Sequence, residues 1–414
     1  MNKAITDNKP DIASAKDRGE PVSLMEPLLI STPSRHREVL QDAAIDLAAK
    51  AAGFRRSLPL RMQSSLADIV RTMNCYYSNL IEGHDTHPIS AERAMNNDYS
   101  KDPKKRNLQL EARAHITVQK WIDDGNLRGA GFATSSLREF HKRFCDLLPP
   151  DMLWIEDEPT KERVAVVPGE FRHRDVAVGG HVAISAGAVP RFLERLENVF
   201  SRLGKSESIL AAASAHHRLL WVHPFIDGNG RVARLMSHAL FLDVLDTGGV
   251  WSIARGLARN VAAYKSHLAN CDLTRRNDLD GRGNLSEEAL AEFTKFFLDV
   301  CLDQVTFMES LMQPDRLRVR ILTWAEEEAR LGALPAQARQ VLEAVLYRGE
   351  LPRGEIPALL GIGDRQSRRI VSMLADRNVL GSDTQKSPLY LKFPAVLASR
   401  WMPGLFPEKT DSEA

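Results

Sequence analysis

The sequence predicts a mainly α-helical protein, a helical bundle with a β-hairpin flap followed by a winged helix-turn-helix domain. Three observations lead to this prediction. Most segments place apolar residues at helical spacing, as in REVLQDAAIDLAAKAAG and SESILAAASAHHRLLWV. One stretch, 163–185, is instead β-branched and contains the turn signals Pro168-Gly169 and Gly179-Gly180, so we expect a short hairpin there. Residues 335–400 read as a helix, a helix-turn-helix and an extended pair, which is typical of a winged helix.

The bulk composition is that of a globular protein of more than one domain. The chain has 414 residues, 43% of them hydrophobic and 26% charged, with a net charge of +1. No global basic field therefore favours nucleic acid, and any such binding would need a local patch. The four cysteines are widely spaced without a CxxC pair, which argues against a zinc knuckle or a disulfide framework and favours a reducing compartment. Because we find no apolar leader and no run long enough for a membrane helix, we expect a cytoplasmic protein without a membrane partner.

The chain divides by composition into six regions. Both termini are polar, and the first contains prolines, so we expect a disordered tail at the N-terminus. The expected regions are a tail over 1–35, an N-terminal helical region over 36–125, a central core over 126–305, a helical linker over 306–334, the winged-helix domain over 335–400 and a tail over 401–414.

The stretch HPFIDGNGRVAR, 223–234, is the most specific signal in the sequence. Gly228 and Gly230 flank Asn229, so the backbone can approach a ligand closely, and a helix-periodic segment follows at once. A glycine-rich turn at a helix N-terminus presents N–H groups and the positive end of the helix dipole, which suits phosphate.

The charged residues of the same stretch favour nucleotide phosphate chemistry. Arg231 and Arg234 lie on one helix face near its N-terminus, where cations are unfavourable unless an anion binds. Asp227 is a hard oxygen ligand suited to Mg²⁺, which normally binds one or two carboxylates together with substrate phosphates. His223 can act as a general base, and Phe225 is expected to anchor the loop in the core. Any one of these residues alone would indicate only a surface loop.

The complete stretch resembles the signature of the Fic family, HxFxDGNGRxxR. The resemblance extends over roughly residues 36–300. AHHRLLWVHPF resembles the helix that leads into the signature, with His216 as a scaffold residue, and VPGEFRHRDVAVGG resembles the flap of the family. NVAAYKSHL, with Asn260 and Tyr264, resembles a nucleotide-contacting helix, although Tyr264 could equally be a core residue. Fic proteins typically transfer AMP, whereas the phosphorylating Doc-like branch has Lys at the position of Gly230.

The resemblance implies a role for each matching residue. His223 would deprotonate a Tyr, Thr or Ser hydroxyl of a target protein, and ATP would be the donor. Asp227 would hold Mg²⁺, and the backbone of Gly228, Asn229 and Gly230 would hold the phosphates together with Arg231 and Arg234. The flap, represented by Phe171, Val176 and Val178, would bind the target by strand-like pairing. Dimers are common in the family, so a homodimer is a further expected partner.

A second stretch, SNLIEG at 78–83, matches the inhibitory motif [S/T]xxxE[G/N] of Fic proteins. Ser78 and Glu82 are four residues apart on one helical face, and Gly83 follows as a helix C-cap. We expect Glu82 to pair with Arg234 and so to occupy the place of the γ-phosphate. The alternative is an ordinary solvent-facing acid. In the family this glutamate can also assist removal of AMP, and that possibility stays open.

Two other readings remain. The histidines at 216, 217, 223 and 238 could suggest a metal-dependent hydrolase, but adjacent histidines face different sides of a helix and no HxxxH pair is present. The winged-helix domain offers Arg365, Arg368 and Arg369 on its third helix, with Lys386 and Lys392 in the wing, for DNA phosphates. The alternative use of that domain is protein contact. The second function class is therefore a nucleotide-sensing DNA-binding regulator, which would not need the base His223.

Overall fold

The computed structural model describes residues 15–157 and 161–407, and these fold into two compact units. The first unit combines the described residues up to Ala44 with Leu127–Leu240 and Ala262–Phe297. The second combines Ile45–Asn126, Phe241–Val261 and the described residues from Leu298 onward. Both units are mainly helical, as the sequence predicts. Among the described residues, none of the helices has the length and hydropathy of a membrane span.

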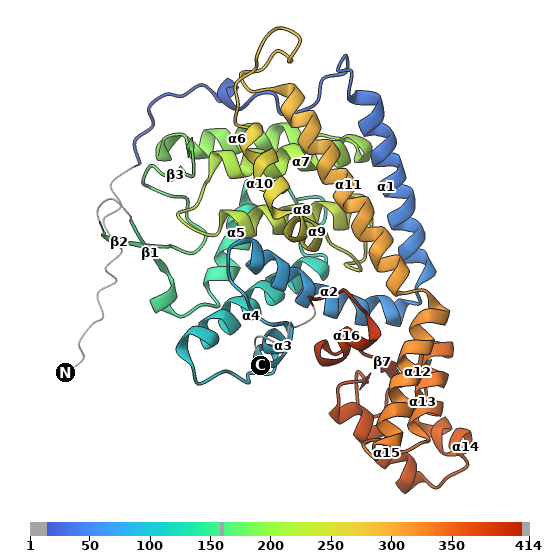
Figure 1. The fold of residues 1–414 in the computed structure, drawn as a ribbon. Helices are drawn as coiled ribbons and strands as arrows, with labels where there is room; N and C mark the ends of the chain where they lie inside the picture. The colour runs from blue at the N-terminus through green and yellow to red at the C-terminus, as the bar shows by residue number, and fades with distance from the viewer. Residues whose placement is uncertain (1–14, 158–160, 408–414) are drawn as a thin grey trace, which may run out of the picture. The chain divides into compact units, whose positions relative to one another are not determined.

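The first unit is built around one almost completely buried helix, α7. Its helices and strands, including those it shares with the second unit, are α1 (Arg37–Ser57), α5 (Thr134–Cys145), β1 (Trp154–Glu156), β2 (Arg163–Ala165), β3 (Ala177–Val178), β4 (His181–Val182), α6 (Val189–Phe200), α7 (Lys205–Val222), α8 (Asn229–Val244), α10 (Val261–Asn270) and α11 (Glu287–Leu311). Figure 1 shows α7 with α6, α8 and α10 around it. Because apolar or small side chains cover most sides of α7, it can be buried all round, while α6 buries one stripe, Val189, Phe192, Leu193, Leu196 and Phe200.

The predicted hairpin at 163–185 is correct only in part. Strand β2 pairs with β1, upstream of the predicted segment, in the register Trp154–Ala165. The strands β3 and β4 form a second, separate hairpin with Ala177 opposite Val182, and Gly179-Gly180 makes its turn. The prediction failed there because a strand of three residues is too short to reveal its pairing partner from local sequence.

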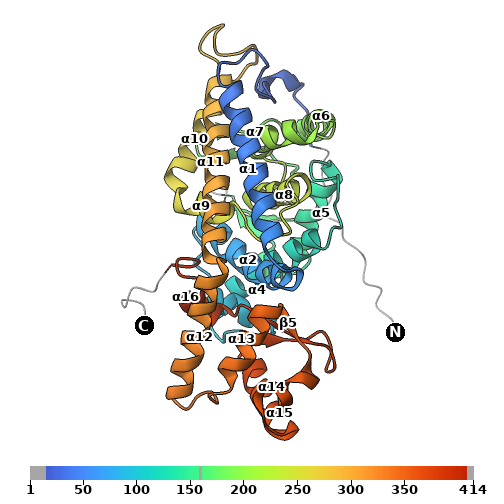
Figure 2. The same cartoon turned by 90° about the vertical axis from the view of Figure 1, so that its right-hand side faces the viewer.

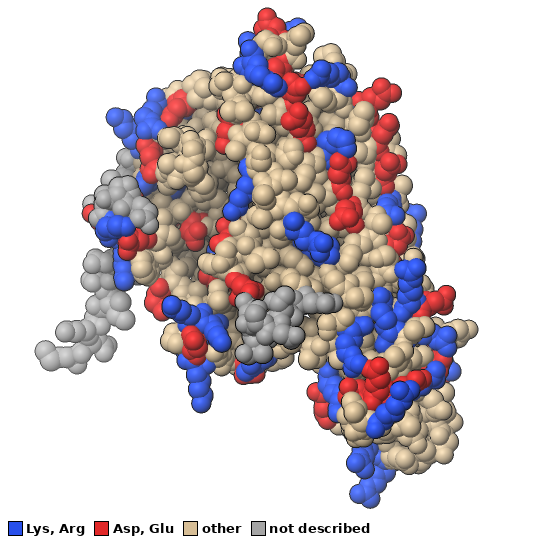
Figure 3. Space-filling view, viewed as in Figure 1, with Lys and Arg blue, Asp and Glu red and all other residues tan. Residues whose placement is uncertain are grey.

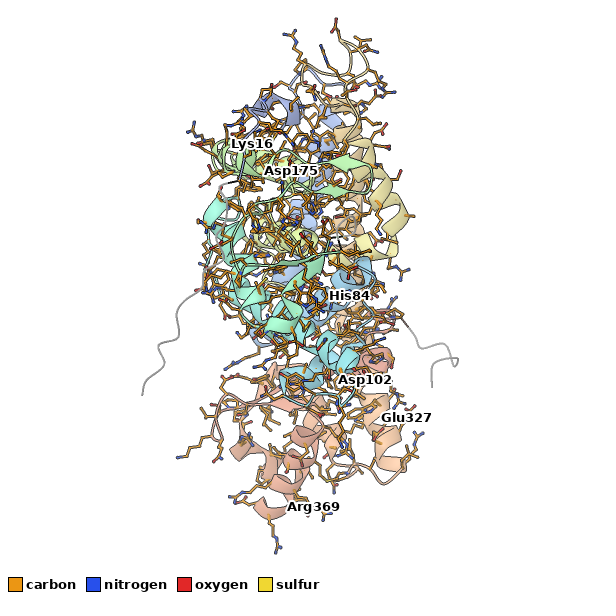
Figure 4. All side chains as sticks on the ribbon, turned by 90° about the vertical axis from the view of Figure 1, so that its left-hand side faces the viewer. Lys16, His84, Asp102, Asp175, Glu327 and Arg369 are labelled. Carbon is orange, nitrogen blue, oxygen red and sulfur yellow. The ribbon has the colours of Figure 1, made fainter. Side chains whose placement is uncertain are left out.

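The predicted disorder of residues 1–35 is wrong for the described part, 15–35. Met25 and Leu28 are buried, and η1 (Val22–Met25) forms a short helical turn. The carboxylate of Glu20 accepts hydrogen bonds from the backbone N–H and the hydroxyl of Ser185 at 2.8 and 2.6 Å. The carbonyl of Lys16 accepts from the N–H of Gly187 at 3.1 Å, and Asp175 accepts from the N–H of Ala186; Figure 4 labels Lys16 and Asp175. Tertiary partners order a segment that looks unstructured by composition, and residues 1–14 lie outside the described ones.

The second unit contains the remaining helices and a three-stranded sheet. Its elements are α2 (Leu60–Ile81), α3 (Pro88–Met95), α4 (Pro103–Asp123), α9 (Ala254–Arg259), α12 (Pro314–Arg330), α13 (Ala338–Arg348), β5 (Glu350–Leu351), α14 (Ile356–Leu360), α15 (Asp364–Asp376), β6 (Leu380–Gly381), β7 (Leu389–Leu391) and α16 (Ala398–Trp401). The antiparallel sheet has the order β5-β7-β6. Figure 2 shows α13, α14 and α15 packed together beside it. The predicted helix, helix-turn-helix and extended pair are all present, while the assignment of 335–400 to the winged-helix class stays a prediction.

The composition suggested a separate C-terminal domain, but the C-terminal region is not separate from the N-terminal helices. Residues 335–407 and α2 to α4 belong to one compact unit. The tail predicted over 401–414 is also wrong in its described part, because Trp401, Met402 and Leu405 are buried. Residues 408–414 lie outside the described ones.

Candidate active site

The signature loop joins the C-terminal end of α7 to the N-terminal end of α8. His223 caps α7 in the left-handed conformation, with φ 50° and ψ 62°. Phe225 is completely buried, as predicted, and its N–H and carbonyl both bind the side chain of Asn229 at 2.9 Å. Gly228 has φ +80°, and α8 begins at Asn229. The predicted glycine turn at a helix N-terminus is therefore confirmed, and Asn229 closes the loop with two hydrogen bonds.

His223 is held as a neutral imidazole with one nitrogen turned to the protein. Its Nδ1 lies 3.3 Å from the carbonyl oxygen of Leu220, so Nδ1–H donates and Nε2 retains the lone pair that a base uses. Burial, and to a smaller extent the positive charge of Arg172, lower the pKa of His223 to about 4. At neutral pH the side chain is therefore in the form that accepts a proton.

The charged residues after His223 have different environments. The side chain of Asp227 is 57% exposed and lies 3.9 Å from Nη1 of Arg231. Arg231 and Arg234 are only 8% and 5% exposed, and the Arg231 guanidinium stacks over the ring of Phe144 at 5.0 Å. Two buried arginines near the N-terminus of one helix concentrate positive charge where the helix dipole is already positive, which favours an anion.

Asp227 fits a magnesium site completed by substrate. In the described ranges, 15–157 and 161–407, no three His, Cys, Asp or Glu side chains converge in a way that could hold a metal ion. The single exposed carboxylate of Asp227 could supply one ligand, since Mg²⁺ usually binds through one or two carboxylates plus phosphate oxygens. The histidine-rich hydrolase alternative has no such cluster in the described part of the chain.

His141 in α5 is a supporting residue that was not predicted from the sequence. Its ring stacks on Phe225 with centroids 4.1 Å apart and an interplanar angle of 4°. Its Nδ1 accepts from the N–H of Gly169 at 2.9 Å, and burial lowers its pKa to about 4. His141 therefore connects the signature loop to the flap base as a neutral ring. The signal in the sequence was its place on the apolar face of α5, with Leu137, Phe140 and Phe144.

The flap residues differ in their exposure. Val178 in β3 is 45% exposed, Val182 in β4 is 71% exposed, and Val176 directly before β3 is half-buried. Phe171 lies outside the hairpin and packs inward, with its ring 5.7 Å from that of Phe225. The hairpin thus presents an apolar edge, while Phe171 belongs to the base of the flap.

The two candidate nucleotide-contacting residues, Tyr264 and Asn260, lie in different units. The Tyr264 hydroxyl is buried and bonds His216 Nε2 at 2.6 Å, while His216 Nδ1 bonds the hydroxyl of Ser237 at 2.9 Å. Tyr264 is thus a core residue of the first unit, and its role at adenine stays a prediction. Asn260 is exposed at the end of α9, in the second unit, with its amide on the carbonyl of Gly256 at 2.9 Å. His216 is a scaffold residue, as expected.

The adjacent histidine has a partner that the sequence did not reveal. His217 lies 3.0 Å from the carboxylate of Asp272 and 3.1 Å from the carbonyl of Leu268. Burial nevertheless lowers the pKa of His217 to about 4. These contacts join α7 to the end of α10 and serve the core of the first unit.

The inhibitory motif lies at the end of α2, in the second unit. Helix α2 ends at Ile81, and its C-cap is the exposed Glu82, one residue before the predicted Gly83, which follows in the left-handed region with φ +86°. Ser78 is buried one turn earlier. These positions fit the motif, and the pairing of Glu82 with Arg234 stays a prediction.

The signature and its surroundings match one family model. Residues 133–241 match the model described as the Fic/DOC family. This chain carries a Fic/DOC domain. The match begins at α5 and ends in α8, so the Fic/DOC domain contains His141, the flap, α7 and the signature.

Curated relatives of the Fic/DOC domain have names that state an activity. Proteins named "Protein adenylyltransferase Fic" from Drosophila yakuba and Drosophila grimshawi are 27% and 26% identical over 169 residues. The match covers 40% of this chain and 31% and 32% of those relatives, so the chain spans about a third of their length.

Solved structures with the same family name are similar over longer stretches. A Fic family protein from Desulfovibrio desulfuricans G20 has a TM-score of 0.48 and 17% identity, over 89% of this chain and 98% of that one. Fic-1 from C. elegans has a TM-score of 0.49 and 15% identity, over 67% and 74%. At this level neither adds to the assignment of the domain.

Proposed function

We propose that this protein is an adenylyltransferase that transfers AMP from ATP to a Tyr, Thr or Ser hydroxyl of a target protein. The observation that carries the proposal is the neutral His223, with its Nε2 lone pair unused by Leu220, at the start of a loop that ends in two buried arginines. The Fic/DOC domain and the names of its curated relatives support the same activity.

The proposed reaction uses each part of the signature once. His223 Nε2 takes the proton from the target hydroxyl, the oxygen attacks the α-phosphorus of ATP, and the bond to pyrophosphate breaks. Arg231 and Arg234 neutralise the β- and γ-phosphates, and the backbone of 228–230 holds the phosphate chain at the start of α8. Mg²⁺ held by Asp227 would offset phosphate charge. The exposed edge with Val176 and Val178 would pair with the target backbone.

The proposal includes inhibition within the chain by Glu82. A carboxylate paired with Arg234 would compete with the γ-phosphate for that guanidinium, so ATP could bind only in an unproductive pose. Support comes from the motif, from the observed C-cap position of Glu82 and from the left-handed Gly83. The same residue could assist removal of AMP, and the protein could modify itself. A homodimer, expected from the family, is tested by measuring the mass of the protein in solution.

The test follows label from α-labelled ATP onto protein in the presence of Mg²⁺. We expect weak labelling by the wild type, strong labelling by Glu82→Gly and none by Glu82→Gly with His223→Ala. The double variant should still bind ATP, because His223 supplies a base and not a phosphate contact. Labelling that survives His223→Ala would contradict the assigned base. A silent Glu82→Gly variant that still binds ATP would contradict the inhibitory role.

A second candidate function, binding of duplex DNA, is favoured by one observation on α15. The outer face of α15 exposes Arg365, Arg368 and Arg369, and no ion pair of these three is found in the described part of the chain. Other arginines of the second unit pair with acids, for example Arg339 with Glu326 and Arg318 with Glu343. Figure 3 shows basic and acidic side chains interspersed over α12 and α13, and Figure 4 shows Arg369 pointing away from its own helix bundle.

Fluorescence anisotropy with a labelled duplex would test this candidate. Each phosphate contact steepens the dependence of log K on log salt by about 0.9. We therefore expect replacement of Arg365, Arg368 and Arg369 by Gln to reduce the slope by about 2 to 3. Arg318→Gln, an arginine already paired with Glu343, is the control. Equal binding by the triple variant and the wild type would leave protein contact as the use of this surface.

A further inference from the structure

The flap contributes a completely buried arginine, Arg172, to the end of the helix that carries His223. Its Nε donates to the carbonyl of His223 at 2.8 Å, and Nη2 lies 3.4 Å from the carbonyl of Val222. Its Nη1 donates to the carbonyl of Arg174 at 2.8 Å, and Nη2 also donates to the carbonyl of Ile184 at 2.5 Å. Its backbone N–H donates to the carbonyl of Pro224 at 2.8 Å.

This arrangement is costly enough to need a reason. Arg172 is 2% exposed, and burying a guanidinium is unfavourable unless its donors are satisfied. The last carbonyl groups of a helix lack hydrogen-bond donors within the helix, and at the end of α7 Arg172 is the donor to them. His223, moreover, occupies the left-handed region, which a non-glycine residue holds only when its surroundings fix it. The same guanidinium that fixes His223 also binds both sides of the β3–β4 hairpin, at Arg174 and Ile184.

We propose that Arg172 is a positioning residue that fixes His223 and the target-binding hairpin to each other through these four carbonyl groups. This inference rests on the proposed function, since it assigns Arg172 to the geometry of that reaction. A target strand paired to the hairpin would then bring its hydroxyl to Nε2 of His223 without a separate adjustment. A misplacement of about 1 Å at a reacting group can cost about 100-fold in rate, so such a connection has a large effect.

The charge of Arg172 acts on His223 as well. The charged and titratable groups that influence His223 are Arg172, His181 and Asp227. Burial is the largest cause of the lowered pKa of His223, and the positive charge of Arg172 acts in the same direction, while Asp227 opposes it. Geometry and charge can therefore be separated by substitution.

Two substitutions of Arg172 test the proposal, in the Glu82→Gly background for rates and in the wild type for titration. Arg172→Met removes the charge and the donors, while Arg172→Lys keeps the charge but cannot serve four carbonyls. Arg195→Met, an arginine of the same unit that pairs with Glu26 at the surface, is the control. The measurements are kcat, the KM for ATP, and the pKa of His223 from NMR of labelled imidazoles, assigned with His223→Ala.

We expect both substitutions to lower kcat at least 10-fold, with the KM for ATP within twofold, because Arg172 contacts no phosphate. The pKa of His223 should rise in Arg172→Met and stay near its original value in Arg172→Lys. Unchanged kcat in a folded Arg172→Lys protein would overturn the proposal, as would equal losses of kcat and ATP binding. If Arg172→Met does not fold, the Arg172→Lys rates decide. If Glu82→Gly itself transfers no AMP, the proposed inhibition fails, and the titration still tests whether Arg172 sets the state of His223.

A separate observation concerns the segment that carries Ser78 and Glu82. The C-terminal region 378–405 contacts the segment 60–95, which includes α2, Ser78, Glu82 and α3, at three points within the second unit. Near its start, Arg61 pairs with Asp383 at 2.7 Å and lies over the ring of Tyr390 at 5.4 Å. Near the end of α2, the Tyr77 hydroxyl donates to the carbonyl of Leu405 at 3.1 Å.

The third point lies in α3, directly after the inhibitory motif. The carboxylate of Glu92 accepts from the amide of Asn378 at 2.7 Å and from the N–H of Ala395 at 2.9 Å. The three attachments use the sheet, the connection after α15 and the C-terminal end, so most of the region 378–405 is involved. We infer that this region holds the segment that carries Glu82 in its inhibitory position, so that loss of these contacts releases the inhibition.

The double variant Tyr77→Phe with Glu92→Ala tests this second inference, which also depends on the proposed inhibition. It removes two attachments without changing the signature or Glu82. We expect self-labelling to increase several-fold, and no further increase when Glu82→Gly is added, because both changes remove the same restraint. Asp98→Ala, which breaks an exposed pair with Arg93, is the control.

Hydrogen exchange of residues 76–85 provides a readout that does not depend on activity. We expect faster exchange there in the double variant. Unchanged labelling, or an increase that adds to that of Glu82→Gly, would overturn the inference. A silent Glu82→Gly protein would instead contradict the proposed inhibition itself.

Discussion

At the scale of single residues, the signature loop depends on Asn229 for its shape. Its side chain serves both the N–H and the carbonyl of Phe225, so one amide replaces two backbone partners that the turn cannot provide. Gly228 can adopt the positive φ that the turn requires, and the two hydrogen bonds of Asn229 then hold the turn in one conformation. The backbone of 228–230, which we propose to bind phosphate, is thereby ordered by contacts within the protein.

Asn229→Ala is expected to lower the free energy of unfolding by about 1 to 3 kcal/mol, because buried backbone groups of Phe225 lose their partners. AMP transfer in the Glu82→Gly background should fall as well. Urea unfolding and labelling from ATP measure the two effects. Asn126→Ala is the matched control, since Asn126 is exposed and makes one hydrogen bond, to the carbonyl of Trp121. Equal losses of unfolding free energy in both variants would show that Asn229 does not stabilise the signature loop more than an exposed asparagine stabilises its own turn.

At the scale of elements, the flap base is fixed to α5 through one glycine. Gly169 has φ +74°, donates to His141 and accepts from Arg138 at 2.8 Å. A Cβ added there would lie 2.9 Å from Cβ of Lys142 and 3.1 Å from the carbonyl oxygen of Arg138. The turn therefore requires glycine both for its conformation and for its closeness to α5.

Gly169→Ala is expected to lower the free energy of unfolding by about 2 kcal/mol or more, through left-handed strain plus a clash with backbone. Gly179→Ala, in the hairpin turn of the same flap, is the control. Gly179 has φ +59°, but its Cβ would meet no atom within 4 Å, so only the conformational strain remains. Urea midpoints compare the two, and a smaller effect at Gly169 than at Gly179 would contradict the tight packing of the flap base.

At the scale of the whole molecule, four buried neutral histidines make stability depend on pH. Burial lowers the pKa of His141, His217 and His223 to about 4 and that of His216 to about 3, from an ordinary value of 6.5. Above pH 6.5 both the folded and the unfolded chain hold these rings neutral, and the full stability is present. As the pH falls from 6.5 toward 4, only the unfolded chain binds the protons, so the free energy of unfolding falls.

We expect these histidines together to bind about 3 to 4 protons when the chain unfolds at pH 5. Each proton corresponds to about 1.4 kcal/mol of stability per pH unit. Unfolding in unbuffered denaturant with a pH-stat counts the protons directly. His217→Asn should reduce the count by about one. An uptake below one proton would mean that these rings are charged in the folded protein.

The sequence alone predicted the chemistry that we propose for this protein, and it determined most of its helices. Regular apolar spacing predicted the helices, because a buried stripe on a helix recurs within a few residues and can be read locally. The signature residues His223, Asp227, Asn229 and Arg231 are likewise close in the chain. A common role could therefore be predicted from the sequence alone. The Fic/DOC match over 133–241 confirms the family reading of that stretch.

Only the tertiary structure decided what lies next to the signature. Arg172 bonds His223, and His141 stacks on Phe225 and bonds Gly169, although all three residues lie far before the signature in the chain. Their roles depend on distances that local spacing does not encode. The order of residues 15–35 and 401–405 was misjudged for the same reason, since a segment becomes ordered when distant partners satisfy its backbone, as Ser185 does for Arg18 and Tyr77 does for Leu405. Local sequence fixes what a segment can do by itself, whereas long-range contacts decide which groups share a site.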